Sequence, residues 1–458
     1  MAYTAFITRI KNLHKHPNAD RLQIGECFGN AIIVSMEYED GQLGIYFPSD
    51  GQLSMEFAEV NNLVRKKDEN GNNIGGYMDP DKRNVTAIKL RGEKSDGLFL
   101  PLRSLESFGD ISILKEGDRI DNFNGHEICC KYVPRRNVRH GHVSEGNRTR
   151  KKKVNVAPLF TEHADTEQLA YNLAAFKPGD EIEITLKMHG TSQRTARLPV
   201  FKGYKRTIWD KLLRREGTPI YDWGYVSGTR RTVLEGFEGG YYGSNEFRKA
   251  HSKFFEGKLW KGEEVYYEVV GFTHTGAPIM ATADNKKLND KDFIKQYGKE
   301  TVFSYGCSSN PICESKIGPD GILYDTRMLE PQSDIYVYRM TMTNEDGDVV
   351  EYTPDFMRYR CEQMGVKTVP VMWKGVIPTV SPSGAGEWIK DVAEEYYDGP
   401  DPIGKTHVRE GVVVRILNRP KFCAYKHKNW SFKALEGIVK VEAEAPDMEE
   451  AQDTTECE

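Results

Sequence analysis

Apolar and polar residues alternate in short runs along much of this chain, which is the pattern of half-buried β-strands. In Glu181–Leu186 an apolar residue stands at every second position, among glutamates and a threonine. Residues 265–270 form a largely apolar run. A second apolar run lies within residues 409–415, and Glu410 precedes it. Such runs are typical of strands that are buried on both faces. The middle and the C-terminal part of the chain therefore predict a core built on sheets.

Short apolar runs also fill the first fifty residues, separated by turn signals such as Pro17–Asp20 and Asp40-Gly41. These runs occupy residues 3–10, 22–28, 31–36 and 43–47. Short strands at this spacing predict a small barrel. The segment His16–Leu22 resembles the opening of OB-fold tRNA-binding domains, although a good turn before a strand explains the same residues equally well. Residues 89–98 join two further expected strands, and their charges suit either a nucleic-acid face or a surface hairpin.

The composition separates folded regions from two strongly charged segments. Hydrophobic residues make up 38% and charged residues 29%, as expected for a folded chain of two or three domains. Residues 131–153 hold nine Lys/Arg and one acid, which predicts an exposed linker, either solvated or in contact with phosphates. Residues 442–458 hold eight acids and no bases, which predicts a disordered tail or, alternatively, a mimic of nucleic acid. Without this tail the net charge of −5 becomes +3, from 63 bases against 60 acids.

Two further features bear on cellular context. No run approaches the roughly 18 apolar residues that a membrane-spanning helix needs, and the first residues read as a strand and not as a signal peptide. The eight cysteines include no Cys-x-x-Cys pair, so we expect no zinc site and free thiols in a reducing compartment. These features predict a cytoplasmic protein without a membrane partner.

The segment with the most informative chemistry is Lys187–Ser192, which reads Lys-Met-His-Gly-Thr-Ser and follows the strand predicted at Glu181–Leu186. A lysine that a strand delivers into a turn can attack a phosphate, and glycine lets the backbone approach a nucleotide closely. Taken alone, the hexapeptide is also typical of an ordinary surface turn. Further along the chain, on or beside expected strands, stand Glu268, Glu410, Lys426 and Lys428.

This order of lysine, glutamate, glutamate and paired lysines resembles motifs I, III, IV and V of the covalent nucleotidyltransferases, the superfamily of ATP-dependent ligases and capping enzymes. His189 stands where DNA ligases and capping enzymes usually have aspartate, which is similar to the RNA ligase branch. Residues 226–231 resemble motif Ia of that branch, and residues 336–338 stand where its motif IIIa supplies an aromatic side chain. The motifs extend over about residues 180–435.

The order of domains narrows the resemblance further. Only about thirty residues follow Lys428, too few for a C-terminal barrel, so the chain resembles nick-sealing RNA ligases with an N-terminal OB domain. The expected fold class is α+β, with an N-terminal OB-like β-barrel followed by an adenylyltransferase (ATP-grasp-like ligase) core of antiparallel sheets with flanking helices. The expected domains are an OB-like nucleic-acid-binding domain at 1–130, a basic linker at 131–160, a nucleotidyltransferase domain at 161–441 and an acidic disordered tail at 442–458.

The resemblance implies an ATP-dependent RNA ligase that uses Mg²⁺ or Mn²⁺ and acts on RNA strand ends in a nicked duplex, with no obligate protein partner. AMP would move from ATP to a lysine and then to an RNA 5′-phosphate, and an RNA 3′-hydroxyl would displace it to seal the strand. Each step is a displacement at phosphorus that depends on in-line geometry and charge neutralisation. A DNA ligase, a capping-type nucleotidyltransferase and a non-catalytic nucleic-acid-binding protein remain alternatives.

The same resemblance assigns a role to each candidate residue. Lys187 is the expected nucleophile, and burial together with nearby cations should lower its pKa. Glu410 is the expected carboxylate ligand of a hard metal ion. The expected nucleotide-binding residues are Glu268 for the ribose, Tyr336 or Tyr338 for adenine, Arg230 or Arg231 for phosphates, and His189, Gly190, Lys426 and Lys428. Lys433 is either a rival phosphate ligand or a surface lysine.

Overall fold

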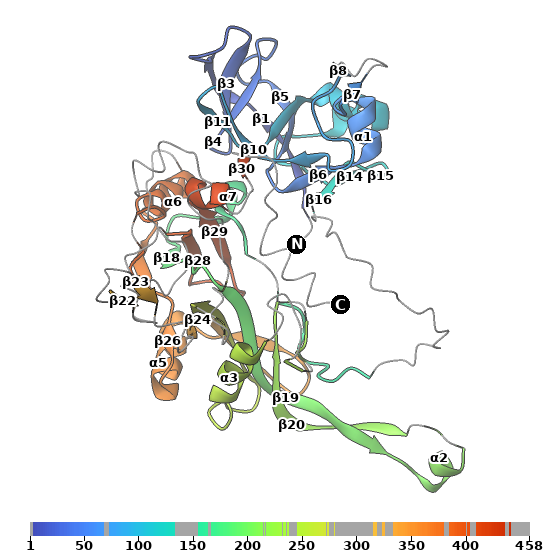
Figure 1. Cartoon of the computed structure of the whole chain (residues 1–458), viewed down its shortest axis with the longest axis vertical. Coiled ribbons are helices and arrows are strands. Elements are labelled where there is room, and N and C mark those ends of the chain that lie inside the picture. The colour runs from blue at the N-terminus through green and yellow to red at the C-terminus, as the bar shows by residue number, and fades with distance from the viewer. Residues whose placement is uncertain are drawn as a thin grey trace. The chain divides into compact units, whose positions relative to one another are not determined.

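The computed structural model describes residues 3–67, 73–132, 154–163, 166–213, 217–230, 232–234, 245–271, 333–379, 384–399, 401–403, 409–435 and 439–440, with short pieces at 215, 236–237, 273, 279, 315–317 and 323–325. The chain divides into two compact units (Figure 1). Unit 1 comprises Met1–Pro134, Ala283–Gln296 and Trp430–Asp447; unit 2 comprises Arg135–Thr282, Tyr297–Asn429 and Met448–Glu458. Both units combine mostly antiparallel sheets with short helices, which confirms the predicted α+β class.

Unit 1 is built from small sheets. The largest has four strands in the order β12-β5-β1-β13, which are Leu98–Pro101, Leu43–Phe47, Ala5–Arg9 and Arg119–Ile120. A second sheet is the meander β2-β3-β4, formed by Lys11–Lys15, Leu22–Cys27 and Asn30–Ser35. The other elements before Pro134 are β6 (Gly51–Leu53), α1 (Met55–Val60), β7 (Lys66–Lys67), β8 (Asn73–Gly75), β9 (Asn84–Val85), β10 (Ala87–Leu90), β11 (Glu93–Ser95), η1 (Leu102–Phe108), η2 (Ile111–Ile113), β14 (Asn122–Phe123), β15 (His126–Glu127) and β16 (Cys129–Lys131).

Each of the four runs predicted in the first fifty residues contains a strand, namely β1, β3, β4 and β5. Apolar side chains of β1 and β5 meet in one core with α1, whose Phe57 is fully buried against Phe47 and Phe108. Helix α1 begins at the Ser54 cap, because the Ser54 hydroxyl accepts a hydrogen bond from the Phe57 backbone amide. No sheet closes on itself among the residues that the structure describes, so the OB-like barrel stays a prediction.

The turn within the heptapeptide His16–Leu22 is fastened to the β10–β11 hairpin. The Nε2 atom of buried His16 lies 3.2 Å from the carbonyl oxygen of Leu90, and Asn18 donates a hydrogen bond of 2.9 Å to the carbonyl of Arg91. The heptapeptide therefore has a structural role, since it holds this turn against the β10–β11 hairpin.

The segment that follows the paired lysines belongs to unit 1 and not to unit 2. Strand β30 (Val439–Lys440) adds to β10 in parallel, and the preceding helix α7 (Trp430–Leu435) contributes the fully buried Phe432. Lys433 forms an ion pair of 2.6 Å with Asp96. This ion pair gives Lys433 a partner within unit 1.

Unit 2 contains two larger sheets. The first has β20-β19-β21-β24-β25 in order, with β26 paired to β24; these strands are Thr218–Gly228, Thr191–Lys205, Glu263–Gly271, Ser333–Thr343, Val349–Glu351 and Lys367–Thr368. The second has the order β17-β29-β28-β18-β27, formed by Glu167–Gln168, Ala424–Lys428, Gly411–Ile416, Glu181–Leu186 and Val371–Val376. The remaining elements are η3 (Leu169–Tyr171), η4 (Leu173–Ala175), α2 (Ile208–Leu212), α3 (Glu246–Phe254), β22 (Ser315–Ile317), β23 (Leu323–Asp325), α5 (Pro354–Met364) and α6 (Ala385–Glu394).

Each sheet of unit 2 has an apolar face that a helix covers. Ile182 and Val414 of the second sheet pack in one cluster with Ile389 of α6, while Val265 of the first sheet packs with Phe247 of α3 and Met357 of α5. Because side chains alternate along a strand, the polar residues of the same strands must point to the opposite face. These opposite faces supply the site described below.

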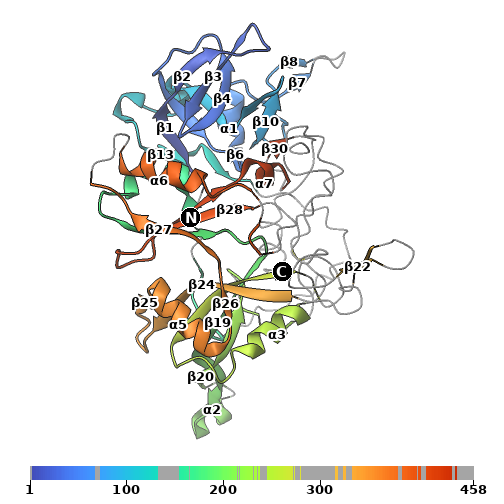
Figure 2. The same cartoon turned by 90° about the vertical axis from the view of Figure 1, so that its left-hand side faces the viewer.

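Strands β19 and β20 continue beyond the first sheet as a two-stranded ribbon. Figures 1 and 2 both show this ribbon extending away from the rest of unit 2, with α2 at its end. Every helix in the described part of the chain is too short or too polar to cross a membrane.

Candidate active site

A cavity in unit 2 collects polar side chains from both sheets and from α3 and α5. Cationic side chains outnumber carboxylates three to one along its described lining. The cations are Lys187, Arg230, Arg248, Arg358, Arg415 and Lys426, and the carboxylates are Glu183 and Glu268. A cavity with this excess of positive charge is suited to a phosphate-bearing ligand.

Lys187 lies in this cavity because of the alternation of β18. Ile182 and Ile184 are buried on the apolar side, and Glu183, Thr185 and Lys187 line the cavity. The backbone amide of Lys187 donates a hydrogen bond of 3.0 Å to the carbonyl of Gly411, so the lysine is fixed next to β28. Its side chain is 13% exposed and donates a hydrogen bond to the carboxylate of Glu410.

Glu410 stands at the centre of a buried charge cluster. Its carboxylate is 1% exposed and contacts Lys187, with Lys428 Nζ at 3.5 Å and His189 Nδ1 at 3.5 Å. Burial by itself raises the pKa of Glu410, but Lys187 and Lys428 outweigh it and hold the pKa of this carboxyl well below its usual range. Glu410 is therefore ionised throughout the neutral range.

The contact with Glu410 changes the expectation for Lys187. Neighbouring cations favour a neutral amine, but a carboxylate in direct contact favours the ammonium form. Lys187 must therefore lose a proton to become the neutral amine that can act as a nucleophile.

Two glycines allow the backbone to pack this closely. A Cβ atom on Gly190 would lie 2.5 Å from the carbonyl oxygen of Val269 and 2.8 Å from Cγ of Glu268. Gly411, next to Glu410, has a φ of +148°, and a Cβ there would lie 2.1 Å from the carbonyl oxygen of His427. Any larger residue at either position would displace a strand that carries a candidate site residue.

Glu268 and the tyrosines share one face of the first sheet. Antiparallel pairing places Ser192 opposite Glu268 and Glu268 opposite Tyr336, so the three residues form one row across β19, β21 and β24. Glu268 and Tyr338 line the cavity, and the Tyr338 hydroxyl lies 3.2 Å from Oγ of Ser192. Burial raises the pKa of Tyr338 to about 12, so the phenol keeps its proton. Tyr336 is instead buried in an apolar cluster with Met188.

The remaining candidates fall into three groups. Arg230, Gly190 and Lys426 line the cavity with Lys187. Glu410 is buried directly behind Lys187, and Glu410, His189 and Lys428 are not among the residues that line the cavity. Arg231 lies outside the described residues, as do most of the basic segment 131–153 and the acidic tail.

Sequence analysis missed Arg248, which α3 brings beneath the turn that follows Lys187. Arg248 is 1% exposed, donates a hydrogen bond of 2.7 Å to the Thr191 hydroxyl, and donates another of 2.9 Å to the Ser192 carbonyl. These contacts hold the start of β19 in place. No periodicity distinguishes Arg248 from a surface arginine, so only the tertiary structure identifies it.

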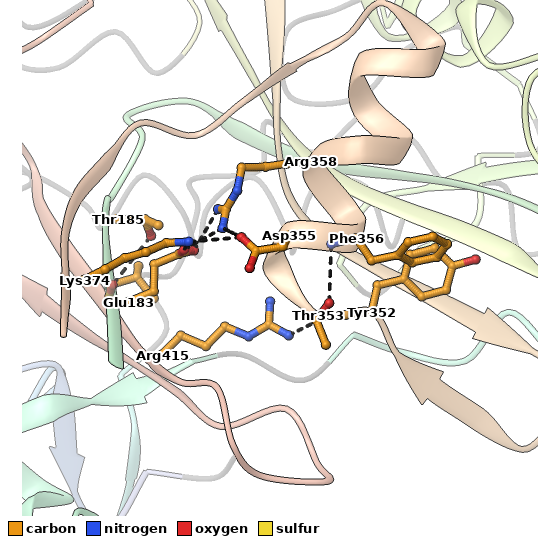
Figure 3. Close-up of polar contacts among 10 residues, drawn as sticks. Glu183, Thr185, Tyr352, Thr353, Asp355, Phe356, Arg358, Lys374 and Arg415 are labelled. Atoms are coloured by element: carbon orange, nitrogen blue, oxygen red, sulfur yellow. Dashed lines mark hydrogen bonds and ion pairs between the residues drawn. The ribbon is translucent and has the colours of Figure 1, made fainter. Parts of the chain in front are cut away.

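A second missed group surrounds Glu183 at one end of the cavity (Figure 3). Arg358 donates hydrogen bonds of 3.2 and 2.9 Å to the two carboxylate oxygens of Glu183, and Lys374 forms an ion pair of 3.0 Å with the same group. Arg415 on β28 donates a hydrogen bond of 3.0 Å to the Tyr352 carbonyl. The alternation of β18 and β28 does place Glu183 and Arg415 opposite the core residues, and this signal could have identified both.

No group of three or more His, Cys, Asp or Glu side chains is arranged to hold a metal ion within the part of the chain that the structure describes. Glu410 nevertheless suits a hard divalent cation, since Mg²⁺ is commonly bound by one or two carboxylates together with substrate phosphates and water. The cations around the cavity provide for the phosphates, so a single carboxylate fits this kind of site.

The fold resembles that of solved RNA ligase structures. A variant of the Naegleria gruberi RNA ligase with AMP and Mn matches with a TM-score of 0.53 at 15% identity, over 93% of this chain and 97% of that one. A second variant, without ligand, gives a TM-score of 0.52 at 16% identity over 95% and 98%, and the enzyme with pyrophosphate gives 0.51 at 16% over 94% and 97%. No protein-family model and no curated protein sequence matches the chain. The predicted resemblance to RNA ligases is thus confirmed at the level of the fold.

Proposed function

We propose that this protein is an ATP-dependent RNA ligase that joins RNA 3′-hydroxyl and 5′-phosphate ends, as in nick sealing during RNA repair. The observation that carries the proposal is the position of Lys187, which lies in a cation-rich cavity in contact with buried Glu410. Glu268, Tyr338 and Lys426, three of the residues predicted from the motifs, line the same cavity. The similar Naegleria structures contain ATP or AMP with Mn, or pyrophosphate, which agrees with this chemistry.

In the first step, neutral Lys187 Nζ attacks the α-phosphorus of ATP. A nitrogen–phosphorus bond forms, the bond from the α-phosphorus to the bridging oxygen breaks, and pyrophosphate leaves with that electron pair. The lysine proton passes to solvent or to the departing pyrophosphate. Lys426, which lines the cavity, offsets the negative charge that develops on the phosphates, and Lys428 supports this through its contact with Glu410.

The nucleoside is oriented by the row of side chains on the first sheet. Glu268 accepts hydrogen bonds from the ribose hydroxyls, and the Tyr338 ring stacks on adenine. Arg230 binds a phosphate by bidentate contacts. His189 packs against Glu410 and fixes the turn that holds Lys187. Glu410 would hold Mg²⁺ or Mn²⁺, which supplies charge neutralisation when bound.

The later steps use the same cavity. An oxygen of the RNA 5′-phosphate attacks the phosphorus of lysyl-AMP, the nitrogen–phosphorus bond breaks, and Lys187 leaves, which gives a 5′–5′ pyrophosphate. The RNA 3′-hydroxyl then attacks the phosphorus of the RNA 5′-phosphate, and AMP leaves. Unit 1, predicted to be an OB-like nucleic-acid-binding domain, would bind the RNA strands.

The decisive experiment is incubation of the full chain with ATP labelled at the α-phosphate, with Mg²⁺ or Mn²⁺, followed by a denaturing gel. The wild type should acquire label, and so should the control Lys374→Ala, which alters the lysine paired with Glu183. Lys187→Ala should acquire none. A nicked RNA duplex should then release the label as AMP. Label from GTP alone would favour a capping enzyme, and no label from either nucleotide would leave a nucleic-acid-binding protein.

A further inference from the structure

The end of the β19–β20 ribbon carries the most exposed large apolar side chains in the described part of the chain. Ile208 is 83% exposed, and Trp209 and Leu212 are each 70% exposed. They stand together on α2, and Leu213, which is 53% exposed, follows directly. Isolated exposed apolar residues are ordinary, but a contiguous group of this size is typical of an interaction surface. We call residues 205–213 together with Arg215 the ribbon tip.

The tip is also strongly basic. Residues 201–217 contain six Lys/Arg and two acids, and Lys205, Arg206 and Arg215 are exposed. Of the two acids, Asp210 is engaged locally, since it accepts a hydrogen bond of 2.9 Å from the Thr207 backbone amide. An excess of positive charge disfavours the pairing of two identical tips and favours a polyanionic partner.

Aromatic side chains continue this pattern along the ribbon. Phe201 lies 5.1 Å from Tyr204 and 6.0 Å from Tyr221 between ring centroids, and none of the three is fully buried. Trp223 lies beneath Lys261, with 5.4 Å from Nζ to the ring centroid. Partly exposed rings that alternate with cations are the pattern of surfaces that bind nucleic acid by stacking and by phosphate contacts.

The ribbon is connected directly to the proposed active site. Strand β19 begins at Thr191 and Ser192, which line the cavity, and β20 leads back to Thr229 and Arg230, which line it as well. Antiparallel pairing from Arg194↔Gly228 to Lys205↔Thr218, with one register shift between Phe201 and Gly203, makes the ribbon a single element. At roughly 3.3 Å per residue, the tip lies about 45 Å from the cavity along β19.

From this placement we propose that the ribbon tip is a second RNA contact, which binds the duplex at a fixed distance of about 45 Å from the ends being joined. Lys205, Arg206 and Arg215 contact phosphates, while Trp209 and Leu212 pack against the sugar edges of the wide, shallow minor groove of an RNA helix. A membrane surface fits less well, because α2 has only five residues and lacks the long amphipathic face of interfacial helices. The inference rests on the proposed function, since it takes RNA ends to be bound at Lys187.

Duplex length provides the test. Nicked RNA duplexes with about 8 or about 30 base pairs on each side of the nick differ in length. At the roughly 3 Å rise per base pair of an A-form helix, only the arms of the longer duplex extend beyond 45 Å. The variant Trp209→Ser/Leu212→Ser should bind the long duplex about tenfold more weakly than the wild type and the short duplex equally well. The control Val349→Ser/Val350→Ser removes exposed apolar side chains from β25 and should match the wild type on both.

Covalent labelling with ATP separates this inference from the proposed function. All three proteins should form lysyl-AMP at equal rates if Lys187 is the nucleophile, since the tip is remote from the cavity. Equal binding of long duplexes by tip variant and wild type would overturn the tip contact while leaving the ligase proposal intact. If the tip variant bound RNA like the wild type but lost vesicle binding or self-association, the RNA contact would be overturned. The partner of the tip would then be a membrane or a second copy of this chain. Absence of labelling in the wild type, with length-dependent loss of RNA binding in the variant, would overturn only the ligase proposal.

Discussion

Glu410 and Glu183 are both buried carboxylates of unit 2, each in contact with two cationic side chains, but their partners differ in kind. Glu410 is paired with Lys187 and Lys428, whose side chains are 13% and 4% exposed. Glu183 is paired with Arg358 and Lys374, whose side chains are 26% and 41% exposed. The first cluster is thus closed and made of lysines, whereas the second is half open and organised around a bidentate arginine.

The difference indicates which cluster performs chemistry and which holds the sheet in place. A lysine can lose its proton and become a nucleophile, but a guanidinium remains charged and keeps its planar, bidentate geometry. Arg358 links α5 to β18 through Glu183, four residues before Lys187 on the same strand face. We therefore interpret the Glu183 cluster as the scaffold that positions β18 and the Glu410 cluster as the reactive centre at its end.

The largest expected effect follows from replacing the reactive carboxylate. Glu410→Gln should slow formation of lysyl-AMP by about 100-fold or more, because Lys187 loses its buried charged partner and the site loses its candidate metal ligand. Single-turnover labelling with ATP measures this rate, and Glu183→Gln is the matched control, with a rate within tenfold of the wild type. A faster reaction in Glu410→Gln would show that the carboxylate only restrains the Lys187 ammonium.

A smaller effect, on stability, is expected from the scaffold carboxylate. Glu183→Gln should lower the free energy of unfolding by about 1–2 kcal/mol, since Arg358 and Lys374 are partly exposed and regain water. Chemical denaturation, followed by the fluorescence of the tryptophans in unit 2, measures the change. An unchanged midpoint together with a 100-fold slower reaction would reverse the two assignments.

The smallest expected effect tests the geometry of the scaffold pair. Arg358→Lys keeps the charge but loses one of the two parallel hydrogen bonds, so it should cost about 0.5–1 kcal/mol of stability. The reciprocal change Lys374→Arg should be close to neutral, because Lys374 is a half-exposed point charge. Equal effects of the two substitutions in the same denaturation measurement would argue against a special role for the bidentate contact.

Local patterns in the sequence account for much of the fold and of the cavity. Alternation along β18 predicted the strand, and the motif order predicted Lys187, Glu268 and Lys426, which line one cavity in the structure. The same alternation placed Glu183 opposite the core, although its role was not recognised. Period-2 patterns carry this information because one residue in two must face the core.

Features that depend on distant packing were not predictable in this way. Arg248 and Arg358 reach the cavity from helices, and nothing in their own neighbourhood distinguishes them from surface arginines. The motif resemblance offered Tyr336 and Tyr338 together, but the packing of Met188 buries Tyr336 and leaves only Tyr338 to line the cavity. Contact between Glu410 and Lys187 also arises from strand order, since β18 and β28 are neighbours in space and distant in sequence.

The attachment of Trp430–Asp447 to unit 1 has a consequence for biosynthesis. Strand β10 lacks its neighbour β30, and Asp96 lacks Lys433, until roughly three hundred further residues have been translated after Pro134. At about 5–20 residues per second this delay lasts about 15–60 s. Unit 1 is therefore completed only after most of unit 2 has been synthesised, and the nascent chain must keep an incomplete sheet edge from pairing wrongly until the segment with β30 arrives.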